Sequence, residues 1–157
     1  MNSPRPVSEA CLLLGSNIDP QANLPAAIAL LRQCVEVADV SLFWETPAVG
    51  SDGPNFWNAA VLVRTRLDAE QLKATVLRPV EARLGRQRSA DKFAQRTIDI
   101  DIVAWNCQVT DPNVWRYAYA AIPVSEVLPC DTRSALGESL ALVALRLAQH
   151  TPIQPRL

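Results

Sequence analysis

The segment Arg96-Thr97-Ile98-Asp99-Ile100-Asp101-Ile102 alternates polar and apolar side chains with a period of two. This alternation predicts a half-buried β-strand, here over residues 97–105, because successive strand side chains point to opposite faces of a sheet. The three isoleucines should face a core, and Asp99 and Asp101 should lie side by side on the other face. The sequence therefore predicts a β-sheet in which the carboxylates of Asp99 and Asp101 lie close together on one face.

Two neighbouring carboxylates on one strand face allow two interpretations. They form the solvent face of an edge strand, or they hold a divalent cation, since magnesium binds through one or two carboxylates together with substrate phosphates. The preceding segment 78–96 favours the second interpretation, because it holds six of the chain's 15 basic residues and only two acidic ones. Arginines that hold phosphate oxygens, next to carboxylates that hold a metal, make up a metal–polyphosphate site.

Composition narrows the class of protein. The chain has 157 residues, 49% of them apolar, which predicts a single domain over 1–157 with its own core. The net charge of −1 gives no global attraction for nucleic acid or an anionic membrane, and no apolar run approaches the roughly 18 residues of a membrane span. Four cysteines without a CxxC pair, and a single histidine, argue against a zinc site and favour reduced thiols in the cytoplasm.

The hydrophobic pattern of the remaining chain predicts strands and helices in alternation. Asn23 is a candidate N-cap for the first helix and Asp68 for the second, and Pro79 should kink the second helix or end it early. Strands are expected over 10–14, 37–44, 56–66 and 97–105, with a short one near 117–122, and helices over 23–35, from 68 onward and over 136–149.

The resulting order, βαββαβ followed by a C-terminal helix, predicts an α+β protein with the ferredoxin-like sandwich. In this architecture an antiparallel sheet carries helices on one face, and the free face would present Asp99 and Asp101. The same fold also serves RNA binding and regulation, so it does not identify a function by itself. An RNA-binding role is disfavoured here, because aspartates on the exposed strand face would repel phosphate without a metal.

Five short motifs, taken together and in order, resemble one enzyme family. They are Leu14-Gly15-Ser16-Asn17, Glu45-Thr46-Pro47-Ala48-Val49-Gly50, Phe56-Trp57-Asn58-Ala59-Ala60-Val61, Glu81 with Leu84-Gly85-Arg86-Gln87-Arg88, and Arg96-Thr97-Ile98-Asp99-Ile100-Asp101. The set resembles 6-hydroxymethyl-7,8-dihydropterin pyrophosphokinase of folate biosynthesis, over roughly residues 10–105. The resemblance implies the ferredoxin-like fold and the transfer of pyrophosphate from ATP to the hydroxymethyl group of a dihydropterin, with release of AMP.

The resemblance also implies a role for each matching residue. Asp99 and Asp101 are expected to hold two magnesium ions that bridge the phosphates of ATP, while Arg86 and Arg96 steady the triphosphate in the transition state. Asn58 is expected to bind the pterin ring edge, because an amide offers both a donor and an acceptor. The other implied positions are Glu81, Arg88, Phe93 and Ile102 on the ATP side, and Thr46, Pro47, Ala48, Val49, Phe56 and Tyr119 around the pterin. The implied partners are two small molecules, ATP and a dihydropterin, with the oligomeric state left open.

The chain departs from the family pattern around the metal strand. Residues 106–123 contain no histidine and look shortened, and Phe93-Ala94-Gln95 stands where the family usually has tryptophan and Gly-Pro. These differences leave two alternatives open, a divergent paralogue acting on another pterin and a non-catalytic pterin- or nucleotide-binding protein. The arginine and aspartate pairs count against the second alternative, because two close carboxylates are costly to keep without a cation.

Overall fold

The computed structural model describes residues 3–86, 96–128 and 132–156. In this part of the chain, strand β1 (Ser8–Ser16) lies at the centre of an antiparallel sheet, between β4 (Phe56–Thr65) and β5 (Asp99–Trp105). The strand order is β6-β5-β1-β4-β3-β7, and β2 also pairs with β4. The bounds of the outer strands are Glu36–Val40 for β2, Phe43–Thr46 for β3, Gln108–Val109 for β6 and Gln154–Arg156 for β7.

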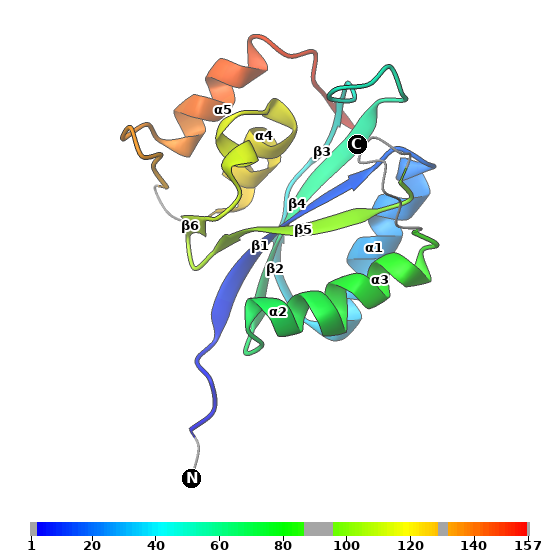
Figure 1. The fold of residues 1–157 in the computed structure, drawn as a ribbon, viewed down its shortest axis with the longest axis vertical. Helices are drawn as coiled ribbons and strands as arrows, with labels where there is room; N and C mark the ends of the chain where they lie inside the picture. The colour runs from blue at the N-terminus through cyan, green and yellow to red at the C-terminus, as the bar shows by residue number, and fades with distance from the viewer. Residues whose placement is uncertain (1–2, 87–95, 129–131, 157) are drawn as a thin grey trace.

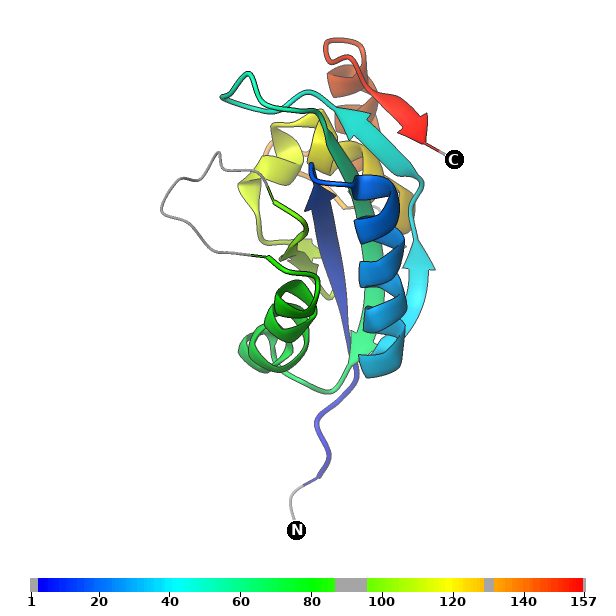
Figure 2. The ribbon, with the colours of Figure 1, turned by 90° about the vertical axis from the view of Figure 1, so that its right-hand side faces the viewer.

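Helices cover both faces of the sheet, as Figure 1 shows. The edge-on view in Figure 2 places the N-terminal helix along the long strands, with the C-terminal helices beyond them. On one side lie α1 (Pro20–Cys34) and a continuous helical segment made of α2 (Ala69–Leu72), the π turn η1 (Lys73–Leu77) and α3 (Arg78–Arg83). On the other side lie η2 (Pro112–Trp115), α4 (Ala118–Val127) and α5 (Leu140–Ala148).

The central strand β1 packs against the helical layers on both faces of the sheet. Its side chains alternate between two apolar layers, with Leu12 and Leu14 packed in the α1 layer and Cys11 and Leu13 in the α4 layer. All four are buried. A continuous apolar run is the pattern of a strand that is covered on both faces.

The expected ferredoxin-like order is confirmed, and the structure adds helix α4 to it. The short strand expected near 117–122 is wrong, because those residues belong to α4. Alanine has the highest helix propensity, and Ala118, Ala120 and Ala121 are buried between the sheet and the neighbouring helices. The face expected to be free is therefore partly covered, and the two aspartates lie at the edge of this cover.

Two other expectations about element boundaries need correction. Asn23 is not the N-cap of α1, because Asp19 holds that position and the Asn23 amide instead donates to the Ile18 carbonyl oxygen at 2.6 Å. The strand expected over 37–44 is split into β2 and β3, because the Ser41 hydroxyl accepts from the Ala60 amide at 2.8 Å and interrupts the ladder.

The second helix begins where the sequence indicates, but it continues past Pro79. Asp68 and Gln71 form a reciprocal capping box at its start. Pro79 does not end the helix, which runs on to Arg83. The π turn immediately before Pro79 is wider than an α-helical turn, and this extra width accommodates a ring that would otherwise meet the carbonyl four residues back.

Strand β5 confirms the alternation expected of it. Ile98 and Ile100 are fully buried and Ile102 packs against the same apolar layer. Asp99 and Asp101 lie on the opposite face. In the described part of the chain, the helices are all too short or too polar to cross a membrane.

Candidate active site

Asp99 lies between two arginine side chains. One of its carboxylate oxygens accepts from Arg86, and the other accepts from Arg96 at 2.9 Å. The Arg86 side chain is 9% exposed, and its Nε atom is buried without an acceptor among the described residues. Since a carboxylate has about four lone-pair positions, Asp99 can bind a cation as well as both guanidinium groups.

Glu81 holds this arginine cluster against the sheet. Its side chain is 3% exposed, and it accepts from Arg78 at 2.6 Å, from Arg86 at 2.9 Å and from the Ile100 amide at 2.9 Å. The bond to Ile100 joins α3 to β5 next to Asp99. Glu81, expected on the ATP side, therefore has its carboxylate occupied by protein donors.

The two aspartates of β5 have opposite electrostatic surroundings. Displacement of water opposes ionisation of Asp99, but the charges of Arg86 and Arg96 outweigh it and hold the pKa of Asp99 below its usual value. Displacement of water, and then the negative charge of Asp99, raise the pKa of Asp101 to about 6. Asp101 thus has a deficit of positive charge, which a metal ion would supply.

A pocket of about 490 Å³ opens on this face between β3, β4, β5 and the loop after β3; we call it the loop-side pocket. It brings together Asp99, Asp101 and Arg96 with all seven residues expected around the pterin. Those seven are Thr46, Pro47, Ala48, Val49, Phe56, Asn58 and Tyr119.

Asn58 lies in the buried wall of the loop-side pocket. Its Nδ2 donates to the Thr46 hydroxyl at 3.0 Å, and both side chains are nearly inaccessible to water. A Cβ atom on Gly15 would lie 3.2 Å from Asn58 Oδ1 and 3.7 Å from Phe56 Cδ1. The glycine therefore leaves room for both groups, and the amide orientation is set by Thr46.

Aromatic rings from two different elements line the same pocket. Phe56 comes from β4 and Tyr119 from α4. Tyr119 also stacks on Tyr117, with the ring centroids 5.5 Å apart. Burial, and then the charge of Asp111, raise the pKa of Tyr119 to about 12, so its hydroxyl stays protonated. A flat ring system between Phe56 and Tyr119 would have apolar faces on both sides and polar groups at its edge.

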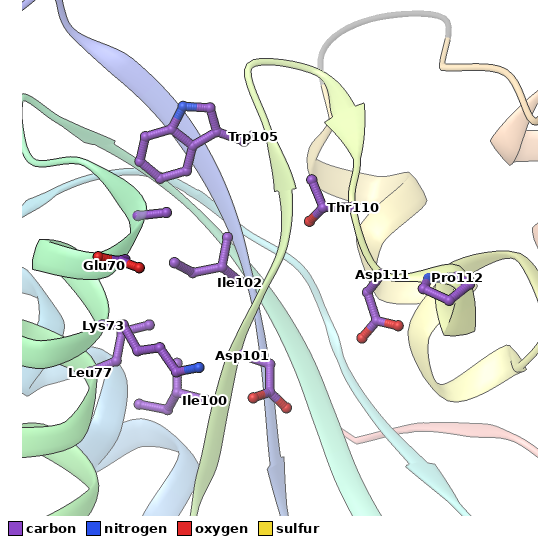
Figure 3. A pocket seen from close by; sticks show the side chains of 11 residues that line it. Glu70, Lys73, Leu77, Ile100, Asp101, Ile102, Trp105, Thr110, Asp111 and Pro112 are labelled. Atoms are coloured by element: carbon purple, nitrogen blue, oxygen red, sulfur yellow. The ribbon is translucent and has the colours of Figure 1, made fainter.

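A second pocket, of about 640 Å³, lies between the α2–η1 helix and strand β5; we call it the helix-side pocket (Figure 3). Its wall includes Ile102, which is thus placed apart from the loop-side residues, together with Lys73, Leu77 and Trp105. Asp101 and Asp111 line both pockets, and in the described part of the chain they alone do so.

The sequence analysis did not predict several residues of the site, and two positions that it did predict lie outside the described residues. Asp111, Asn113 and Tyr117 line the loop-side pocket without having been expected there. An aspartate followed by proline is an N-cap signal, and Asp111 does cap η2, but this local signal does not reveal its place in space. The expected positions Arg88 and Phe93 fall outside the described residues.

The acidic side chains fit a metal only together with further ligands. In the described ranges there is no group of three or more histidine, cysteine, aspartate or glutamate side chains arranged to hold a metal. Asp99 and Asp101 alone could supply one or two carboxylate ligands, which is the number that magnesium takes from protein when phosphate oxygens complete its shell.

Comparison with known proteins is consistent with this geometry. A family described as 7,8-dihydro-6-hydroxymethylpterin-pyrophosphokinase matches residues 11–129. Two similar proteins share the description 2-amino-4-hydroxy-6-hydroxymethyldihydropteridine pyrophosphokinase. The one from Porphyromonas gingivalis is 30% identical over 75% of this chain and 89% of its own length. The one from Helicobacter pylori is 48% identical over 54% of this chain and 58% of its own length.

A solved structure supports the fold. The chain described as Plasmodium falciparum HPPK-DHPS superimposes with a TM-score of 0.69 over 96% of this chain, at 10% sequence identity. This chain spans 44% of that one. At so low an identity the likeness concerns the fold alone.

Proposed function

The chain belongs to the 7,8-dihydro-6-hydroxymethylpterin-pyrophosphokinase family, and from that premise we propose that it transfers pyrophosphate from ATP to 6-hydroxymethyl-7,8-dihydropterin, releasing AMP. The family is one of enzymes in folate biosynthesis that use ATP as co-substrate. The observation that carries the proposal for this chain is the loop-side pocket. It joins every expected pterin-binding residue to the Asp99–Asp101 pair.

On the pterin side, Asn58 would recognise the polar edge of the ring, and two aromatic side chains would stack on its faces. The Thr46 hydroxyl holds the Asn58 amide, which leaves the amide oxygen turned toward Gly15 and the pocket. A pterin edge carries donors and acceptors in alternation, which a fixed amide can match. Phe56 and Tyr119 would lie against the two faces of the ring.

On the phosphate side, Asp99 and Asp101 would hold magnesium, which would neutralise charge on the triphosphate during an in-line displacement. Arg86 and Arg96 supply positive charge at the same place. The unsatisfied Nε of Arg86 supports a ligand oxygen as its partner, because a buried donor without an acceptor is costly. The adenosine part would extend into the helix-side pocket past Ile102.

The test is AMP release by the purified protein with ATP, magnesium and 6-hydroxymethyl-7,8-dihydropterin. AMP should form only when the pterin is present. Asp101→Asn should lose this activity, whereas Asp39→Asn, a matched change at an exposed position on β2, should keep it. Pterin-dependent thermal stabilisation without AMP would contradict the proposal and indicate a binding protein instead.

A further inference from the structure

The two pockets meet at two carboxylates, Asp101 on β5 and Asp111 at the start of η2. Figure 3 shows both carboxylates directed toward the same side of the pocket. If one substrate occupies each pocket, as the proposed function requires, the transferred group must pass at this junction. The reacting atoms would therefore lie beside Asp101 and Asp111.

The two carboxylates cannot both be explained by the metal. Asp101 is paired along β5 with Asp99, and the two together form the proposed metal ligands. Asp111 comes from a different segment, and it belongs to no group of three acidic side chains that could hold a metal within the described ranges. The Asn113 amide already donates to Oδ1 of Asp111 at 2.9 Å. A triphosphate repels the remaining carboxylate oxygen, so that oxygen needs a second donor or a cation in front of it.

The acceptor substrate would bring such a donor to the junction. A pterin between Phe56 and Tyr119, with its polar edge at Asn58, has its hydroxymethyl substituent as the group left to reach the phosphate. Asp111 lines the same pocket as all three residues. Its charge also contributes to the raised pKa of Tyr119, which is consistent with a position close to that ring.

We propose that Asp111 accepts a hydrogen bond from the hydroxyl group of the pterin's hydroxymethyl substituent and then takes its proton. This rests on the proposed function. As the hydroxyl oxygen forms its bond to the β-phosphorus of ATP, its O–H bond breaks and the proton passes to the Asp111 carboxylate. The bond from the β-phosphorus to the oxygen bridging to the α-phosphate breaks, and its electron pair leaves with AMP. An aspartate in protein kinases receives the substrate hydroxyl proton in the same way.

The structural role of Asp111 can be separated from this chemical one. Its Oδ1 accepts from the Asn113 amide at 2.9 Å and so caps η2. Asp111→Asn keeps an oxygen for the cap and removes only the charge and the basic oxygen. Asp68→Asn is the matched control, because Asp68 caps α2 in the same way, accepting from Gln71 at 2.8 Å, and lines neither pocket.

The first experiment is a binding titration without ATP, using 6-hydroxymethyl-7,8-dihydropterin and its 6-methyl analogue. Asp111→Asn should weaken binding of the hydroxymethyl compound several-fold and leave the methyl compound unchanged, because only the former offers a hydroxyl donor. Equal losses for both compounds, or no loss for either, would overturn the proposed contact. Asp68→Asn should bind both like the wild type.

The second experiment measures turnover. Asp111→Asn should lower kcat about 100-fold at saturating substrates, within the range that a positioned proton acceptor contributes. Recovery of kcat at high magnesium would overturn the proposal, since it would make Asp111 a metal ligand. If the wild type releases no AMP, the proposed function and the proton step fall together, while the pterin titration still decides whether Asp111 contacts the hydroxyl group.

Discussion

Replacing Glu81 by glutamine should destabilise the protein strongly, because this carboxylate is buried among donors. The variant keeps an oxygen for the Ile100 amide and Arg86, which share Oε2 of Glu81, but it turns its amide group toward Arg78, which is itself a donor. Glu81 is only 3% exposed, so water cannot reach the amide group, and only the outer part of Arg78, at 27% exposure, can bind water in place of its lost acceptor. Removing one member of a buried ion pair costs about 3–5 kcal/mol. Because Arg86 keeps its pair with Asp99 and Arg78 is partly exposed, we expect a loss of about 3 kcal/mol.

The assay is urea denaturation followed by tryptophan fluorescence. Because the urea dependence of unfolding free energy is about 1–3 kcal/mol per molar for small proteins, the midpoint should fall by at least about 1 M. Glu36→Gln is the control, since Glu36 pairs with Arg64 at 3.1 Å on the exposed surface and its loss should hardly move the midpoint. An unchanged midpoint for Glu81→Gln, accompanied by a higher KM for ATP, would refute the structural role and restore Glu81 as a direct nucleotide contact.

Three further predictions concern the pterin wall and Asp101. Gly15→Ala should weaken pterin binding, measured by titration, because the added methyl group would lie 3.2 Å from Asn58 Oδ1 and displace the amide; unchanged affinity would place the pterin edge elsewhere. Asn58→Ala should cost about 1–3 kcal/mol of pterin affinity, by leaving ligand groups and the Thr46 hydroxyl unpaired, and a titration that matches the wild type would remove it from the pocket. In the metal-free protein, the pKa of Asp101 is raised from 3.8 to about 6. Ionisation of Asp101 therefore disfavours the folded state, and the contribution of this residue to the free energy of unfolding falls as the pH rises from about 4 to 6. Asp101→Asn should therefore gain stability relative to the wild type at pH 7 but not at pH 4, and parallel denaturation curves at both pH values would contradict this.

The site residues could be predicted from the sequence where they lie on a single strand or in a single short motif. The alternation over 96–102 specifies which side chains share a face, since strand geometry repeats every two residues whatever the partner strands are. The same holds for the pterin side, where motif residues on β3 and β4 come together because those strands pair directly, Thr46 opposite Phe56 and Trp44 opposite Asn58.

The remaining features depended on contacts between distant segments. Tyr117 and Tyr119 are spaced like residues of a strand, but the alanines beside them favour a helix, and burial between the sheet and α5 stabilises that helix. Glu81 resembles a ligand in sequence, and its burial against the Ile100 amide arises when α3 packs on β5. Asp111 has no motif that marks it, and it reaches the site because β6 folds back along β5.

The sequence by itself determined the order of strands and helices as far as β5, the apolar layer under β5 and the paired carboxylates above it, because each follows from local periodicity and spacing. Only the tertiary structure decided that helices cover both faces, that Arg86 and Arg96 hold Asp99, and that two pockets meet at Asp101 and Asp111. The reason is that burial and electrostatic surroundings are set by residues far apart in the chain, and no local pattern specifies which of them meet.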